Sequence, residues 1–497
     1  MHQQLDEPCG CIVDGQAFKG SGEQFSVLEP WSGRVLATLN AASPSEVSGA
    51  VESSARAFEQ WSSTPVSRRI EILTSFASSL DEHAEELASL QVRENGKLYK
   101  ELLGQAQQFG DHLRYYASLL RLPVGQVIQP PIDGLYVRTE RSPLGVVAAI
   151  TPWNSPLNLL IWKLGPALAA GNTVIVKPSE ITPLSTLRLA QIASESGLPD
   201  GVLNVVCGAA ETGMALVKNP KVQKIAFTGS SAAGQEIAKS ASIGMRDVSL
   251  ELGGKSANIV FMDSKIDVAL RGAVAGIFGA SGQSCMAGSR ILVQSSIYDR
   301  FLNDLTSCAD NLTLGNPFEE SSDMGSVASP GQLEKIEAMV SRAIEQGARV
   351  VAGGKRDSVV GFPDGLYYRP TLITDVTPDM EIFQEEVFGP VAVIVPFETE
   401  QEAIDLANDT RYGLAAGVWT ENGPRADRVA KQLKSGTVWV NNYRKVAYNV
   451  PFGGFKDSGL GRENGPFCLE QFSETKCIWV DEGLGVPDPF NPRANRN

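Results

Sequence analysis

Cys285 is the side chain whose sequence context most favours nucleophilic chemistry. It ends the run Gly279-Ala-Ser-Gly-Gln-Ser-Cys285, where glycines allow a bound substrate to approach the backbone closely. A thiolate at this position could attack a carbonyl carbon and form a thiohemiacetal. A lone cysteine is more often an ordinary apolar core residue, and Cys207 and Cys308, which lack such a context, keep that interpretation.

The base for such a nucleophile is expected to be a residue other than histidine. The three histidines lie at positions 2, 83 and 112, and none follows. A carboxylate can act instead if burial raises its pKa. Glu251 is the candidate because it ends the apolar run Val248-Ser-Leu-Glu251 and precedes two glycines. Its alternative role is a helix cap or a surface ion pair.

An oxyanion formed by thiolate attack needs fixed hydrogen-bond donors. Asn154, together with the backbone N–H of Cys285, fits that role. An asparagine between Pro152 and Pro156 could otherwise satisfy loop backbone groups. No metal site is predicted, because Cys9-x-Cys11 has no second ligand pair at zinc-binding spacing.

The elements that must position these side chains alternate between strand and helix. Short β-branched runs indicate strands at 146–150, 173–176, 203–207, 224–227 and 248–251. Helix-length segments lie between them at 156–171, 183–197, 211–219 and 232–243. Repeated βαβ units predict a parallel sheet covered on both faces. A second alternation begins after Gly254. Two further helices are expected near the N-terminus, one opening with a capping box at Ser43 and one over about 65–92.

Ligands bind where strands of a parallel sheet run into loops, and polar motifs stand at those junctions. They are Thr151-Pro-Trp-Asn154, Lys177-Pro-Ser-Glu180, Thr228-Gly-Ser230, Glu251-Leu-Gly-Gly254, Gly282-Gln-Ser-Cys285, Glu385-Glu-Val-Phe388-Gly-Pro390 and Pro451-Phe-Gly-Gly454. In this order the motifs resemble the aldehyde dehydrogenase superfamily, over about residues 20 to 480. The resemblance implies oxidation of an aldehyde to a carboxylic acid with NAD or NADP, with Cys285 as nucleophile and Glu251 as general base. It also implies a proton-relay pair at Lys163 and Glu463.

Several residues are expected to bind the cofactor. Lys177 and Glu180 could hydrogen-bond the adenosine ribose, and a carboxylate there would repel a 2'-phosphate, which favours NAD over NADP. Gly229 and Ser230 begin a helix whose N-terminus suits a pyrophosphate, although the pattern G-x-G-x-x-G is absent. The resemblance adds the nicotinamide contacts and other positions along the cofactor path, namely Glu386, Phe388, Trp153, Thr151, Ser179 and Leu252.

The substrate tunnel is assigned by correspondence with the same family. Ser155 stands where several relatives carry a bulky aromatic residue, so the tunnel should be wider here. Arg444, beside Lys445, could pair with a carboxylate on the aldehyde, as in a semialdehyde. The alternative is a solvated basic pair on a surface loop. The remaining tunnel positions are Leu159, Trp162, Met286 and Tyr448 within the loop 444–450.

The expected fold class is α/β, with a dinucleotide-binding parallel-sheet domain, an α/β catalytic domain and a small β oligomerisation element. Residues 1–120 and 144–253 should form the first and 254–457 the second. Residues 121–143 and 458–497 should form the third, through which a homodimer or homotetramer would assemble.

Composition excludes several other classes of protein. The 497 residues carry 43 Lys and Arg against 57 Asp and Glu, a net charge of −14, which argues against nucleic-acid or anionic-membrane binding. The uncharged stretch 142–162 is long enough to mimic a membrane span, but its prolines and asparagines predict buried protein interior. No export signal opens the chain, and seven scattered cysteines do not form a disulfide pattern. A cytoplasmic enzyme with reduced thiols is expected.

Two alternatives stay open. A CoA-acylating semialdehyde dehydrogenase would pass the thioester to CoA, although such relatives generally lack the glutamate that Glu251 supplies. A catalytically retired binding protein on the same scaffold is the second. The combination of Cys285, Glu251 and Asn154 favours a hydrolytic NAD-dependent enzyme acting on a small-molecule aldehyde, aromatic or carboxylate-bearing.

Overall fold

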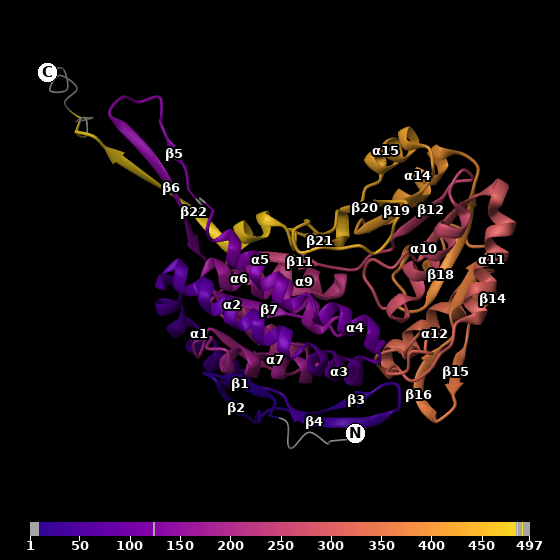
Figure 1. Ribbon diagram of the computed structural model, residues 1–497, viewed down its shortest axis with the longest axis horizontal. Helices are drawn as coiled ribbons and strands as arrows, with labels where there is room; N and C mark the ends of the chain where they lie inside the picture. Colours follow the sequence, from indigo (N-terminus) through magenta and orange to yellow (C-terminus); the bar gives the residue numbers. More distant parts are fainter. Residues whose placement is uncertain (1–8, 123–124, 484, 486–489, 491–497) are drawn as a thin grey trace.

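The computed structural model describes residues 9–122, 125–483, 485 and 490. Figure 1 shows two α/β units side by side and an arm that projects from the first of them. The first unit is built around an eight-stranded sheet and the second around a seven-stranded sheet.

The first sheet contains the predicted parallel strands. Five neighbouring strands run parallel in the order β9-β8-β7-β10-β11. The strands of this sheet are β1 (Cys11–Val13), β2 (Gln16–Phe18), β7 (Val146–Ile150), β8 (Thr173–Lys177), β9 (Leu203–Val206), β10 (Val222–Thr228), β11 (Asp247–Glu251) and β21 (Gly459–Leu460). The crossover helices are α6 (Pro156–Ala170), α7 (Leu184–Glu195), α8 (Ala210–Lys218) and α9 (Ser231–Ser242). The βαβ pattern read from the sequence is therefore correct.

The strand order creates a crevice at one place. From β7 the chain moves to β8 and β9 on one side, then crosses to β10 and β11 on the other. Ligands bind outside the carboxyl ends of the strands at such a switch point. Residues 151–154 follow β7 and residues 228–230 follow β10, so these two predicted motifs meet there.

Helices from the N-terminal part of the chain cover the first sheet. They are α1 (Pro44–Ser63), α2 (Val66–Glu82), α3 (Ala84–Asn95), α4 (Tyr99–Ala106) and α5 (Phe109–Leu119), and a hairpin of β3 (Gln24–Glu29) and β4 (Arg34–Asn40) precedes them. The predicted capping box is present, because Ser43 and Glu46 bond each other's backbone N–H groups. The single helix expected over 65–92 is two helices. His83 leaves helical geometry between them, and its ring nitrogen Nδ1 lies 2.7 Å from the carbonyl oxygen of Ser79.

The second unit has a mostly parallel sheet in the order β14-β17-β18-β13-β12-β19-β20. Its strands are β12 (Ala257–Val260), β13 (Arg290–Gln294), β14 (Arg349–Ala352), β17 (Thr371–Thr374), β18 (Val391–Phe397), β19 (Ala415–Trp419) and β20 (Thr437–Val440). Its helices are α10 (Ile266–Phe278), α11 (Tyr298–Asn311), α12 (Pro330–Glu345), α13 (Glu381–Gln384), α14 (Glu400–Asn408) and α15 (Gly423–Gln432), and β15 (Arg356–Val359) and β16 (Phe362–Tyr368) form a hairpin.

The arm is a three-stranded antiparallel sheet of β22 (Ser473–Asp481), β6 (Leu135–Pro143) and β5 (Val127–Ile128), in that order. Figure 1 shows it extending away from both units. The segment that precedes β22 lies with the first unit, because β21 pairs with β11 and the 3-10 helix Pro466–Phe472 contacts α6. The arm thus begins at Ser473 on the C-terminal side.

The uncharged stretch 142–162 lies inside the protein. It comprises the end of β6, the buried strand β7 and the buried first half of α6. Within the described part of the chain, no helix combines the length and apolarity needed to cross a membrane. The seven cysteines all have free thiols.

Candidate active site

Cys285 is positioned by a tight turn after α10. The 3-10 turn Gly279–Gly282 contains two non-glycine residues in the left-handed region, Ala280 with φ 57° and Ser281 with φ 54°. Gly282, with φ 69°, packs against the backbone of Gly389, and a Cβ atom there would lie 1.9 Å from the carbonyl oxygen of Gly389. The glycine-rich run therefore packs the nucleophile loop against the second unit and aims Cys285 at the first.

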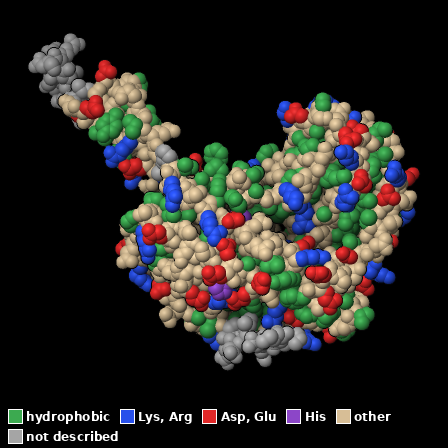
Figure 2. All heavy atoms as spheres, in the orientation of Figure 1, with side chains coloured by type: hydrophobic (Ala, Val, Ile, Leu, Met, Phe, Trp, Pro, Cys, Tyr) green, Lys and Arg blue, Asp and Glu red, His purple; other side chains and the backbone are tan. Residues whose placement is uncertain are grey.

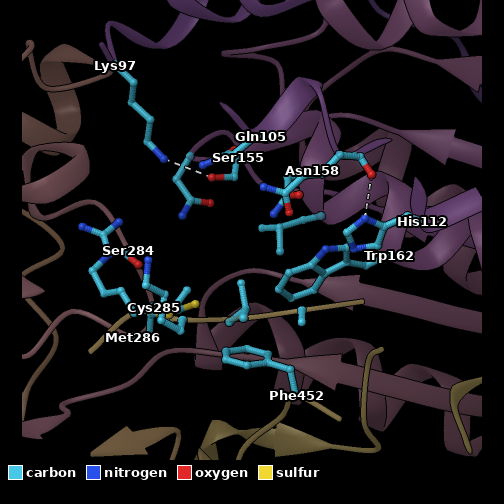
Figure 3. Close-up of a pocket in the computed structure, with 17 residues that line it drawn as sticks. Lys97, Gln105, His112, Ser155, Asn158, Trp162, Ser284, Cys285, Met286 and Phe452 are labelled. Atoms are coloured by element: carbon cyan, nitrogen blue, oxygen red, sulfur yellow. Dashed lines mark hydrogen bonds between the residues drawn. The ribbon is translucent and has the colours of Figure 1, made fainter. Parts of the chain in front are cut away.

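Cys285 lies where two cavities meet. The first, which we call the polar cavity, has a volume of about 270 Å³. The second, the sheet-edge cleft, has a volume of about 140 Å³ and lies along the loops after β7, β10 and β11. Asn154 and Leu159 also line both. Figure 3 shows the thiol of Cys285 at the edge of the polar cavity. A carbonyl compound held in the polar cavity could therefore approach the thiol from one side, and a cofactor held in the sheet-edge cleft could approach it from the other.

Glu251 ends β11 and lines the sheet-edge cleft beside Cys285. It is buried, and neither carboxylate oxygen has a hydrogen-bond partner among the residues that the structure describes. Burial raises the pKa of Glu251 well above its ordinary value, and the charge of Glu463 raises it further, against opposing effects of Lys163 and Arg462. Gly453 leaves room for this carboxylate, because a Cβ there would lie 2.8 Å from Oε1. An unpartnered carboxyl with a raised pKa can accept a proton near neutral pH.

The two residues assigned to a proton relay are in contact. Lys163 on α6 forms a buried ion pair with Glu463, and its ammonium also donates to Thr228 Oγ1 over 2.6 Å. The second oxygen of Glu463 has no hydrogen-bond partner within the described part of the chain. The backbone of Glu463 pairs with Phe452. The Lys163–Glu463 pair therefore lies close enough to Glu251 to change its pKa.

The thiol of Cys285 is protonated at neutral pH in the free chain. Burial raises its pKa to about 12, and the charges of Glu386 and Glu251 add to the rise, while the amides of Met286 and Cys285 itself oppose it. The thiolate needed for attack must therefore form by proton transfer to a nearby base.

Asn154 is held so that its amide faces Cys285's loop. Its Nδ2 donates to the carbonyl oxygen of Gln283 over 3.0 Å, which fixes the side chain and leaves its second N–H for another acceptor. Because Asn154 lines both cavities, that second N–H can serve an oxygen bound next to Cys285.

The sheet-edge cleft contains most of the predicted cofactor contacts. Glu386 accepts a hydrogen bond from the Gly254 N–H over 3.1 Å, and burial raises its pKa to about 7. The rings of Trp153 and Phe388 meet edge to face, with centroids 5.2 Å apart. Gly229, Ser230 and Leu252 complete the predicted residues that line it. Gln332 and Lys335 also line the cleft and were not predicted, since the surface of α12, which lies between the Cys285 and Glu386 motifs in the sequence, carries no local signal.

The other predicted cofactor residues lie at the end of β8, next to the cleft. Lys177 and Glu180 form an ion pair of 3.7 Å. Ser179 accepts a hydrogen bond from the Ile181 N–H over 3.3 Å. Thr151 joins this strand end to β7 through its N–H, which donates to the Lys177 carbonyl over 3.1 Å. These four residues are not among those that line the cleft itself.

The polar cavity brings together five of the six predicted substrate residues, Ser155, Leu159, Trp162, Met286 and Arg444. Tyr448 stands behind it, and its ring packs against His112 with centroids 5.3 Å apart. Further lining residues were not predicted. Lys97, Gln105, Gln108 and His112 come from the segment of α4, α5 and their connections, far in sequence from every motif, and Asn158 on α6 lies just after the motif 151–154 but outside it.

Comparison with known proteins finds similar chains over nearly the whole length. The model of the aldehyde dehydrogenase family matches residues 18–478. Betaine aldehyde dehydrogenase of Bacillus subtilis is 39% identical over 484 residues, which are 97% of this chain and 99% of that protein. An aldehyde dehydrogenase of Emericella nidulans is 41% identical over 479 residues, 96% of this chain and 95% of that one. The crystal structure of betaine aldehyde dehydrogenase from Staphylococcus aureus in complex with NAD+ has a TM-score of 0.94 and 38% identity, covering 97% of this chain and 95% of that one.

The chain belongs to the aldehyde dehydrogenase family. This assignment confirms the resemblance drawn from the motifs and the predicted α/β fold class.

Proposed function

We propose that the protein oxidises an aldehyde to the carboxylic acid with NAD and water, through a thioester on Cys285. The observation that carries this proposal is the place of Cys285 between two cavities, with the unpartnered carboxyl of Glu251 in the cleft beside it. In balance, aldehyde, NAD+ and water give carboxylic acid, NADH and a proton.

The first step forms the thiohemiacetal. Glu251 accepts the thiol proton, and Sγ of Cys285 bonds to the carbonyl carbon of the aldehyde. The carbonyl oxygen gains negative charge, and the free N–H of Asn154 Nδ2 together with the backbone N–H of Cys285 stabilises it. Donors of this kind contribute about 2.7–4 kcal/mol each to the transition state.

The residues of the sheet-edge cleft fit NAD. The α9 N-terminus after Ser230 offers backbone N–H groups to a pyrophosphate, and Glu386 offers a carboxylate to ribose hydroxyls. The Trp153–Phe388 pair flanks the end of the cleft near Cys285. Bound NAD supplies the acceptor for the hydride that leaves the thiohemiacetal carbon. Glu180 beside Lys177 disfavours a 2'-phosphate, so NAD is the cofactor rather than NADP.

The second step is hydrolysis. Once the thiol proton accepted in the first step has left Glu251, Glu251 takes a proton from water, the water oxygen bonds to the thioester carbon, and the C–S bond breaks. The carboxylic acid leaves, and Glu251 returns its proton to the Cys285 thiolate. The Lys163–Glu463 pair carries the proton from Glu251 away from the site. Because Glu251 is present and unpartnered, water rather than CoA is the acyl acceptor.

The arm supports a homodimer or homotetramer, since it carries exposed apolar side chains away from both units. The enzyme acts in the cytoplasm on a small-molecule aldehyde, carboxylate-bearing or aromatic.

NADH formation from a panel of aldehydes tests this function, with and without CoA and with NADP in place of NAD. We expect CoA-independent turnover that Cys285→Ala abolishes. In Glu251→Gln we expect at most a single-turnover burst of NADH, because hydrolysis loses its base. Turnover that requires CoA would replace the hydrolytic assignment, and NAD+ binding without NADH formation on any aldehyde would indicate the retired scaffold.

A further inference from the structure

Lys97 is a buried cation that points into the polar cavity without an anionic partner. Its side chain is 3% exposed, and its ammonium donates to Ser155 Oγ over 3.0 Å (Figure 3). In the described part of the chain, no carboxylate forms an ion pair with it. An ammonium carries three N–H donors, and a buried charge is stable only when it is paired or hydrogen-bonded.

The backbone places Lys97 with precision. Gly96 ends α3 in the left-handed conformation at φ 75°, and the Lys97 N–H donates to Asn95 Oδ1 over 3.0 Å. A Cβ on Gly96 would lie 2.0 Å from Ser326 Oγ, so this turn is packed against the second unit. The ammonium is therefore directed at the cavity by a fixed turn.

Of the four other buried lysines among the described residues, three pair with carboxylates and one, Lys255, does not. Lys163 pairs with Glu463, and Lys224 pairs with Asp247 over 3.0 Å. A carboxylate therefore offsets the charge of most of the buried ammonium groups in the described part of the chain. The Lys97 ammonium faces the polar cavity, whose described lining offers it no such carboxylate.

The lining of the polar cavity is cationic. Lys97, Arg444 and Lys445 line it, and none of the described lining residues is Asp or Glu. Burial lowers the pKa of His112, so its ring is neutral at pH 7. The chain as a whole has a net charge of −14, so this positive cavity runs against the overall charge of the molecule.

The charged groups that face Lys97 leave its charge available. Glu101 on α4 attracts it, but one Glu101 oxygen accepts the Ala280 N–H over 3.2 Å and no ion pair forms. Arg444 repels it, and Arg444 in turn donates to the Ala275 carbonyl over 2.9 Å. Burial lowers the pKa of Lys97 to about 8, so most of it is protonated at pH 7.

We infer that the polar cavity binds an aldehyde that carries a carboxylate, and that the Lys97 ammonium and Ser155 hydroxyl bind this carboxylate while Cys285 attacks the aldehyde carbon. The inference rests on the proposed function and adds the substrate class to it. Arg444 and Lys445 lie on the same cavity and strengthen the positive potential around the bound anion. A volume of about 270 Å³ suits a short carbon chain between the two ends.

This lining opposes the substrate named for two of the relatives. Betaine aldehyde carries a quaternary ammonium, and a cation bound beside Lys97 and Arg444 would meet like charge in a cavity whose described lining has no acid. Aromatic faces attract such cations, and Trp162 and Phe452 line the cavity as well. Betaine aldehyde is therefore the competing ligand in the test.

Binding, measured apart from catalysis, tests the inference. Succinate, a dicarboxylate with no aldehyde, is titrated calorimetrically into NAD-loaded Cys285→Ala at pH 7. We expect saturable binding that weakens about tenfold to a hundredfold on adding Lys97→Met or Lys97→Gln, as for the loss of a charged hydrogen bond. Lys97→Arg should restore part of the affinity. Lys100→Met is the matched control, because Lys100 lies on α4 and donates to the Ser322 carbonyl outside the cavity.

The pH dependence of succinate binding to Cys285→Ala gives a second test, in which Lys97 itself is unchanged. Succinate binding to Cys285→Ala should weaken as the pH rises above about 8, where Lys97 loses its proton. Absence of succinate binding, equal affinity in the Lys97 variants and the Lys100 control, or tighter binding of betaine aldehyde than of succinate would each overturn the inference. NAD+ titration of every variant verifies that the fold is intact.

Turnover separates this inference from the proposed function. With 4-oxobutanoate, Lys97→Met should raise KM about tenfold or more, with butanal changed less than about threefold. An equal loss on both aldehydes would assign Lys97 a structural role. Failure of the wild type to form NADH from any aldehyde would reject the proposed function, whereas the succinate titration would still decide the binding role of Lys97.

Discussion

Lys163 and Glu463 form an ion pair inside the protein, and the two partners act in opposite directions on Glu251. The charge of Glu463 raises the pKa of Glu251, and the charge of Lys163 lowers it. Residues 300 positions apart in sequence thus set the protonation of the base that ends β11. The pair is a positioning and tuning element for the proposed hydrolysis.

Replacing Glu463 with Gln should therefore move the acid limb of the kcat profile to lower pH. The substitution removes a negative charge near Glu251 and leaves the positive charge of Lys163 unopposed, so the carboxylate of Glu251 forms at lower pH. Steady-state NADH formation from pH 5 to 9 would measure the shift. Glu470→Gln is the control, because Glu470 is exposed and does not contribute to the pKa of Glu251. An acid limb that stays in place or moves to higher pH contradicts the coupling.

The free chain should alkylate slowly at Cys285. Because the pKa of this thiol is about 12, its reaction with iodoacetamide should accelerate from pH 7 to pH 10 without reaching a plateau. Glu386→Gln removes the carboxylate whose charge contributes most, after burial, to the raised pKa of this thiol, and should speed the reaction at a given pH. Mass spectrometry of the Cys285 peptide, with exposed Cys477 on β22 as internal reference, would follow it. A plateau below pH 8 would show that the thiolate is already stable in the resting site.

The strands of the first sheet and the polar motifs that follow them were predictable, because both depend on local sequence pattern. The apolar strands β7, β8, β10 and β11 end in polar motifs, and a parallel sheet must gather those ends at one edge. The candidates Cys285, Glu251 and Asn154 were chosen in this way, since each stands at a strand end or in a glycine-rich loop, and the structure brings all three to one cleft.

The walls of the polar cavity were not predictable in the same way. Lys97 lies between two helices, and its contact with Ser155 depends on how α3 and α4 pack against α6, which no local pattern encodes. The break at His83 was also missed, because the apolar period of α2 and α3 continues across it. The cavity walls and the helix break at His83 therefore depend on long-range packing, which sequence periodicity does not reveal.

Glu180 should set the preference for NAD over NADP. Its carboxylate, 43% exposed, lies 3.7 Å from the Lys177 ammonium at the end of β8. Glu180→Gln removes the repulsion of a 2'-phosphate and leaves Lys177 free to attract it, so kcat/KM with NADP should rise about tenfold relative to NAD. Initial rates with both cofactors give the ratio, and Glu195→Gln on α7 is a remote control. An unchanged ratio would remove Glu180 from the cofactor site.

Arg444 should contribute to the binding of acid-bearing aldehydes only. It lines the polar cavity while its Nη1 donates to the Ala275 carbonyl, so its charge reaches the cavity from a fixed loop position. Arg444→Ala should raise KM for 4-oxobutanoate about threefold to tenfold, less than Lys97→Met does because Arg444 is less buried. Butanal kinetics are the comparison. An equal rise for both aldehydes would place Arg444 in loop structure rather than in substrate binding.

The arm should hold two copies of the chain together. Among the described residues, its outer strand β22 pairs on one side only, and Trp479 on that strand is 57% exposed. On β5, Val127 is 78% exposed and Ile128 is 42% exposed. Figure 2 shows hydrophobic side chains gathered on the arm. An exposed edge strand with apolar side chains pairs readily with another chain.

Light scattering of the eluted protein should give a dimer or tetramer, and Trp479→Asp should shift it toward the monomer. Met245→Asp, which replaces an exposed apolar side chain remote from the arm, should leave the assembly unchanged. A wild-type monomer, or equal dissociation in both variants, would show that the arm has another role.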